Sequence, residues 1–202
     1  MKNSRKTTKV DKVNLRKPDI KYLEVRLVGE TPYLPEPMDD AVLEMYNAKK
    51  SKKTYKKDDI GEEEKVKSKY YWTQDGKKGL PARAVYKAMI RASRYIIDRK
   101  DGGMGKIREG VVVLGDVLPL EYDNEKILTH WGRTPGQNRS PRKIMRNAFN
   151  GWSVNIRIQF NADQISAEQI VNVLYSAGVH IGVGGFRREN SGQYGMFDIE
   201  IV

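Results

Sequence analysis

The 202-residue sequence contains no cysteine and only two histidines. Without thiols the chain has no disulfide framework, no cysteine zinc ribbon and no thiol nucleophile, and an intracellular protein fits this composition best. His130 and His180 lie far apart in the sequence, so a zinc site built on histidines is disfavoured as well. We therefore expect neither a bound metal nor a cofactor.

Long apolar runs are also missing. No stretch is long enough to span a bilayer, and the first 17 residues lack the apolar centre of a secretory signal. The chain has no Gly-Lys-Ser/Thr sequence, so a P-loop is excluded. The glycines around Gly184 follow a predicted helix and do not open one, so they do not form a dinucleotide-binding fingerprint. We expect a cytoplasmic protein, in a bacterial cell or an infected host cell, with no membrane partner.

What the sequence has in excess is positive charge. It contains 37 lysines and arginines against 26 acids, a formal net charge of +11, which favours a polyanionic partner such as RNA or DNA. Residues 126–162 contain no acid at all, and Trp131 lies in this stretch among cations that include Arg139, Arg142 and Lys143. Aromatic rings among cations are typical of single-strand binding. The alternative is that Trp131 packs on the core.

Two segments are rich in charge and poor in apolar residues. Residues 1–17 carry seven cations and one acid, and we expect a disordered basic arm. An insertion over about 35–80 is dense in both signs of charge and contains the cluster Tyr70, Tyr71 and Trp72. These rings either stack on bases or attach the insertion to the core.

Periodic patterns predict two helices. The first begins at Pro81, and Val85, Met89, Ala92 and Ile96 share its apolar face. The opposite face carries a row of four cations: Arg83, Lys87, Arg91 and Arg94. The second helix opens with a capping box of Ser166 and Gln169 and ends at Gly178.

Apolar residues alternate with polar ones, as in strands, over four stretches: 20–34, 111–122 with a bulge at Gly115, 152–160 and 197–201. The resulting order is strand, helix, strand, strand, helix, strand. This order predicts an α+β, ferredoxin-like (βαββαβ) fold, an antiparallel sheet with two helices on one face. We expect a single domain over 18–202, with the insertion and with long loops at 99–109 and 123–150.

The last 25 residues hold a glycine-rich loop before the final strand. Gly184, Gly185 and Gly192 flank two adjacent arginines, Arg187 and Arg188. Glycines let backbone N–H groups approach a phosphate closely, and arginines supply charge. We therefore predict a phosphate site in this loop.

The same loop resembles a known family. Gly184-Gly185-Phe186-Arg187-Arg188, followed by Gly-Gln-Tyr-Gly-Met-Phe from Gly192, is similar to the C-terminal glycine-rich loop of the RAMP superfamily, the RNA-binding subunits of CRISPR effector complexes. The segment 79–87 resembles the family motif that opens the first helix, although its serine pair is absent. The layout is also similar to small phage proteins with the same ending, so the chain is alternatively a stand-alone phage-encoded relative of the family.

The resemblance implies non-catalytic binding of single-stranded nucleic acid, RNA in preference to DNA. Several copies would line up along the strand or join a ribonucleoprotein complex. The residues predicted to bind the strand are Gly184, Gly185, Arg187, Arg188, Gly192, Arg83, Lys87, Arg91, Arg94, Trp131, Arg139, Arg142 and Lys143.

Two other functions stay open at this stage. One is a metal-independent endoribonuclease of the guide-processing type, in which His130 or His180 would be the general base. The other is a phage-encoded interaction protein or inhibitor that binds a protein partner through its charge. A strand-binding protein should lose affinity for nucleic acid steeply with salt, whereas a protein with this last function should show little salt-dependent affinity.

Overall fold

The computed structural model describes residues 16–37, 69–133 and 141–202, with the backbone alone at 130–133 and 142. Within these ranges the central feature is a four-stranded sheet with the order β4-β8-β1-β9. Its members are β1 (Ile20–Gly29), β4 (Val111–Val113), β8 (Ser153–Asn161) and β9 (Phe197–Ile201). All neighbouring pairs run antiparallel.

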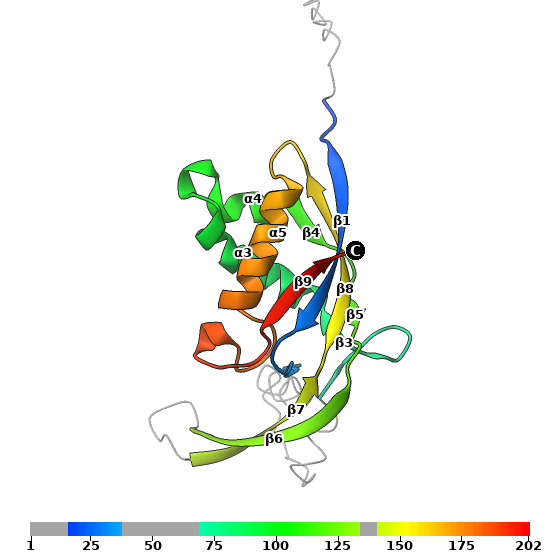
Figure 1. Ribbon diagram of the computed structural model, residues 1–202, viewed down its shortest axis with the longest axis vertical. Coiled ribbons are helices and arrows are strands. Elements are labelled where there is room, and N and C mark those ends of the chain that lie inside the picture. Colours follow the sequence, from blue (N-terminus) through cyan, green and yellow to red (C-terminus); the bar gives the residue numbers. More distant parts are fainter. Residues whose placement is uncertain (1–15, 38–68, 134–140) are drawn as a thin grey trace, which may run out of the picture.

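Two helices join strands that are not neighbours in this sheet. In the chain, α3 (Ala82–Ile96) comes between β1 and β4, and α5 (Ala167–His180) comes between β8 and β9. Figure 1 shows both helices on the same face of the sheet. This strand order with two such crossovers is the ferredoxin-like arrangement, so the predicted fold class is confirmed.

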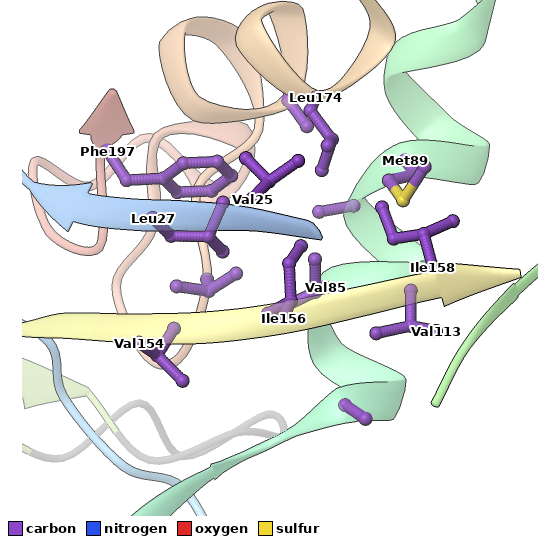
Figure 2. Close-up of a cluster of buried hydrophobic side chains, with 14 of the residues drawn as sticks. Val25, Leu27, Val85, Met89, Val113, Val154, Ile156, Ile158, Leu174 and Phe197 are labelled. Carbon is purple, nitrogen blue, oxygen red and sulfur yellow. The ribbon is translucent and has the colours of Figure 1, made fainter. Parts of the chain in front are cut away.

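The main core fills the space between the sheet and the helices (Figure 2). Alternate residues of the two central strands point into it, among them Val25 and Leu27 of β1 and Ile156 and Ile158 of β8. The helices and the edge strands add Val85, Met89, Leu174, Val113 and Phe197. Removing this apolar surface from water is the main term that stabilises the domain, at about 25 cal/mol per Å².

The helix ends follow from local sequence. Ser166 forms the predicted capping box, because its hydroxyl accepts from the Gln169 N–H at 3.1 Å and its own N–H donates to the Gln169 side chain at 3.2 Å. α3 begins directly after Pro81. Ile96 was predicted on the buried face of α3 but is 41% exposed, because Ile97, the first residue beyond the helix, turns into the core instead and is only 4% exposed.

A second, smaller sheet corrects the prediction for residues 111–122. It has the order β2-β3-β5 and consists of β2 (Tyr71–Trp72), β3 (Lys78–Pro81) and β5 (Val117–Pro119). The single bulged strand predicted here is therefore wrong, since β4 and β5 belong to different sheets. Gly115, with a φ of +97°, lies between the two strands in a conformation that favours glycine.

Other boundaries also differ from the prediction. β1 stops at Gly29 and does not continue to Leu34, and Gly29 packs so close to the Trp152 indole that no side chain fits there. The segment predicted as a loop at 99–109 contains the short helix η1 (Arg99–Asp101) and most of α4 (Gly103–Gly110), which buries Ile107 completely. No helix in the described ranges is long and apolar enough to cross a membrane.

The largest difference concerns residues 123–150, which were predicted to be a loop. They contain two ten-residue strands, β6 (Asn124–Arg133) and β7 (Pro141–Asn150), paired antiparallel from Asn124 with Asn150 to Arg133 with Pro141. We call this pair the ribbon. Figure 1 shows it as a long, curved hairpin extending from one end of the domain. At its base Phe149 exchanges two backbone hydrogen bonds of 2.9 Å with Tyr33.

Candidate nucleic-acid interface

The glycine-rich loop between α5 and β9 (residues 181–196) packs against the chain that leaves β1. The N–H groups of Gly185 and Gly195 donate to the carbonyls of Leu34 and Pro32, at 2.8 and 2.9 Å. The Val183 N–H closes the loop on itself by donating to the Gly195 carbonyl at 2.8 Å. The loop is therefore a folded element with fixed contacts at both its ends.

The glycines of this loop are needed for close packing within the chain. A Cβ atom at Gly184, whose φ is +79°, would lie 2.4 Å from the Leu34 carbonyl oxygen, and one at Gly192 would lie 1.6 Å from that of Phe186. The N–H groups of Gly185 and Gly192 already donate to main-chain carbonyls. These two N–H groups are therefore already used within the chain, and the arginines supply the positive charge of the loop.

The two arginines have different surroundings. Arg188 opens the short helix η2 (Arg188–Asn190) and is exposed. The side chain of Arg187 is only 23% exposed, and it donates to the Gly184 carbonyl and to the Glu189 carboxylate, both at 3.1 Å. Arg187 therefore holds the loop together, whereas Arg188 presents its charge to solvent.

Glu189 connects the loop to α3. The same carboxylate oxygen that accepts from Arg187 also accepts from the guanidinium of Arg91, the third cation of the predicted row. The row and the loop, predicted separately, are thus brought together at one acid. Nothing in the sequence pattern indicated the role of Glu189, because its two partners lie on different elements.

The other cations of the row face solvent. Arg83, Lys87 and Arg94 are exposed, and α3 contains no acid. The Arg94 guanidinium lies over the neighbouring Tyr95 ring, with its central carbon 4.8 Å from the ring centroid. This side of α3 is therefore uniformly cationic, and its charge is not neutralised within the helix.

The ribbon joins the loop through Arg146 of β7. Its guanidinium forms an ion pair with Glu36 and lies 4.7 Å from the centroid of the Phe186 ring. Further along β7, Lys143 is exposed and pairs in register with Trp131. Arg139 lies outside the described residues, and the side chains of Trp131 and Arg142 lie outside them as well, so for these three the prediction stands as it was made.

A partly buried polar cluster holds the base of the ribbon. Glu125 of β6 accepts from the Tyr70 hydroxyl and, at 2.5 Å, from Lys78 of β3. Burial and the hydrogen bond to Glu125 raise the pKa of Tyr70. Burial lowers the pKa of Lys78, but the hydrogen bond and charge of Glu125 outweigh it, so that the net pKa is raised and the cation is retained.

The three aromatic residues Tyr70, Tyr71 and Trp72 of the predicted insertion differ in their surroundings. The Tyr70 ring packs 6.0 Å from Phe149 and so attaches this segment to the core. Tyr71 donates its hydroxyl to the Glu36 carbonyl at 2.7 Å, and burial raises its pKa. Trp72, by contrast, is 53% exposed and presents a ring to solvent.

The opposite face of the sheet has a different character. Its outward residues lie on the side away from the helices, and the charged ones are three acids and two arginines: Glu24, Asp198, Glu200, Arg26 and Arg157. Arg157 pairs with Glu24 at 3.5 Å, and Arg26 pairs with Glu121 at 2.9 Å. The positive charge of the chain is therefore not spread evenly over its described surface.

The structure adds little to the residues considered for nuclease chemistry. His180, one of the two candidate bases, is the last residue of α5 and is exposed. The side chain of His130 lies outside the described part of the chain. Within that part, no group of three or more histidine, aspartate or glutamate side chains is placed to hold a metal ion.

No protein-family model matches this chain, and no curated protein matches it in sequence. Solved structures do resemble it. A chain of the Type III-B Cmr-beta complex bound to cognate target RNA aligns with a TM-score of 0.52 and 12% identity over 91% of this chain, which spans 61% of that chain's length. This likeness shows that the two chains share a fold.

Two further structures are similar at lower scores. Cmr6 from Pyrococcus furiosus aligns over 91% of this chain and 99% of its own, with 11% identity and a TM-score of 0.43. Csc2 from Thermofilum pendens aligns over 92% of this chain and 66% of its own, with 14% identity and a TM-score of 0.35.

Proposed function

We propose that this chain binds single-stranded nucleic acid, without cutting it, on the side formed by α3, the glycine-rich loop and the ribbon. The observation that carries the proposal is the asymmetry of charge. Lys87 of α3, Lys143 of the ribbon and Arg188 of the loop are exposed, and α3 contains no acid, while Glu125 of the ribbon and Glu189 of the loop are each paired with cations. The open face of the sheet carries more acids than cations. A polyanionic strand gains most where cations are not already neutralised.

The contacts within this side support one continuous surface. Glu189 ties α3 to the loop, and the Arg146 guanidinium ties the loop to the ribbon through Glu36 and Phe186. A strand that crosses this surface would meet cations from three elements whose relative positions are fixed before it binds. Such preorganisation reduces the ordering that binding requires.

A single strand fits this surface better than a duplex because of its aromatic residues. Trp72 and Tyr95 are each more than half exposed, on elements next to the cations. Rings can stack only on bases that are not already stacked and paired in a duplex. We propose RNA in preference to DNA because the Cmr-beta chain with the same fold was solved in a complex bound to target RNA.

The fold likeness also supports an assembly. The Cmr-beta chain is a subunit of a larger complex, and the present chain would likewise act in several copies along a strand or within a ribonucleoprotein. The phosphate contacts of each copy would then add up along the strand. This part of the proposal rests on the likeness and on the glycine-rich ending that resembles RAMP subunits.

The test is binding of the purified chain to fluorescent single-stranded RNA, single-stranded DNA and duplex, each at two salt concentrations. We expect tight binding of RNA that weakens steeply with salt, with intact RNA on a denaturing gel afterwards. Cleaved RNA would replace the proposal by the nuclease function. No binding to any of the three would leave a protein partner as the function to pursue.

A further inference from the structure

A small aromatic cluster lies where the C-terminal ends of α3 and α5 meet. The rings of Tyr95 in α3 and His180 in α5 have centroids 4.8 Å apart and planes inclined at 40°. Tyr95 is 52% exposed and His180 is exposed too, so neither ring belongs to the core. The Arg94 guanidinium lies over Tyr95 and donates to its hydroxyl at 2.9 Å. We call these three residues the Tyr95 cluster.

The position of the Tyr95 cluster relates it to the proposed phosphate contacts. Tyr95 follows Arg91 by four residues in α3, so the two side chains are neighbours on the helix surface, with Cβ atoms about 5–6 Å apart. Arg91 in turn is held by Glu189, next to the exposed Arg188. The Tyr95 ring thus lies next to Arg91 on the helix, and Arg91 is bound by Glu189, the residue that follows Arg188.

We infer that the Tyr95 cluster is a stacking site for one base of the bound strand, whose backbone phosphate is held by Arg91 and Arg188. The inference rests on the proposed function and adds a base contact on the helix side, away from the ribbon. Every base has a π-face that can stack on an exposed ring, so the site would accept all four bases.

The present partner of Tyr95 does not block this role. Arg94 is exposed, and a cation that lies over a ring at a solvent-exposed site is held only weakly. When a base stacks on Tyr95, the guanidinium can move from the ring to a neighbouring phosphate and keep a charged partner. His180 contacts the ring from the side of α5.

The chain contains a matched control for this site. Tyr22 in β1 is 53% exposed and has Arg157 over its ring at 4.7 Å, nearly the same exposure and cation distance as Tyr95. Tyr22 lies on the open face of the sheet, where Arg157 is paired with Glu24. The two tyrosines are therefore exposed to nearly the same fraction, and they differ in the charge around them and in the His180 ring beside Tyr95.

The experiment measures the affinity of the full chain for a fluorescent single-stranded RNA, as wild type and as Tyr95→Ala, Tyr95→Phe and Tyr22→Ala. We expect Tyr95→Ala to raise Kd about fivefold or more, in line with the loss of one stacked base. Tyr95→Phe keeps the ring and should stay within about twofold, and Tyr22→Ala should bind like wild type. The salt slope should not change in any variant, because stacking releases no counterions.

Crosslinking identifies the contact directly and does not depend on any variant being folded. Irradiating the wild-type chain with RNA that contains 4-thiouridine should give an adduct on the peptide with Tyr95 or with His180. Wild-type binding together with an unchanged Tyr95→Ala affinity, or an adduct at Tyr22 instead, would overturn this site and leave the proposed function intact. No RNA binding by wild type would overturn the proposed function, and this site with it.

Discussion

Arg91 of α3 and Glu189 of the glycine-rich loop form an ion pair, and Arg187 donates to the same carboxylate oxygen. Two arginines on separate elements are thus held by one acid that is 20% exposed. A carboxylate between two guanidinium groups occupies a position that suits a phosphate. Glu189 therefore both assembles the loop on α3 and competes with the strand for two of its cations.

The first prediction concerns this competition. Glu189→Gln keeps an oxygen that can accept from one arginine but removes the negative charge, so both guanidinium groups become available to phosphate. We expect tighter binding of single-stranded RNA, with a salt slope steeper by about 0.7 for each additional phosphate contact. Fluorescence anisotropy at four salt concentrations measures both quantities. Weaker binding with an unchanged slope would mean that Glu189 acts only as a structural support.

A second experiment distinguishes the roles of the two adjacent arginines. Arg188→Ala should weaken RNA binding, reduce the salt slope by about 0.7 and leave the melting temperature unchanged, since Arg188 is exposed. Arg187→Ala should weaken binding and also lower the melting temperature, because it removes the bonds to Gly184 and Glu189. Equal melting temperatures for the two variants would contradict the different roles given to them.

Glycine substitutions test whether the loop glycines serve packing. Gly192→Ala would place a Cβ 1.6 Å from the Phe186 carbonyl oxygen, and we expect a loss of about 2 kcal/mol or more in the free energy of unfolding. Gly105→Ala is the control, because in α4 it meets no atom within 4 Å. It should stabilise the domain by about 0.5–1 kcal/mol. Chemical denaturation of both variants measures the difference.

The proposed assembly predicts how many copies bind to RNAs of different length. Mass photometry of the chain with single-stranded RNAs of increasing length should show complexes that grow by one copy at a time. The increment in length per copy gives the site size. One copy on every RNA, whatever its length, would contradict binding in several copies and leave the site on each copy unaffected.

The ferredoxin-like order could be predicted because it depends on local patterns. Val25 and Leu27 alternate with polar residues, and Ser166 with Gln169 marks a helix start. Each of these signals spans only a few residues of the chain. The ribbon escaped prediction because its two strands, rich in polar and charged residues, lack the regular alternation of apolar and polar residues that marks the other strands. Its polar residues are stabilised by the opposite strand and by the packing of Phe149 on Tyr33, a partner more than a hundred residues away.

The sequence indicates separate cationic elements but not the contacts that join them. The row on α3 follows from helical periodicity, and the two arginines stand out in the sequence. The acids that join these parts, Glu189 and Glu36, have partners on other elements, so no spacing in the sequence indicates them. The loop glycines are predicted to contact a ligand, and the structure adds a packing role, because Gly184 and Gly192 make room for carbonyls of the chain itself.

The central claim is that the strand lies on the side of α3 and the loop, and two double variants test it most directly. Lys87→Ala with Arg188→Ala removes two charges from that side, and Arg26→Ala with Arg157→Ala removes two from the open face of the sheet. We would measure RNA affinity against salt for both. We predict a salt slope lower by about 1.4 for the first pair and unchanged for the second. An unchanged slope for the first, or an equal decrease for both, would contradict it.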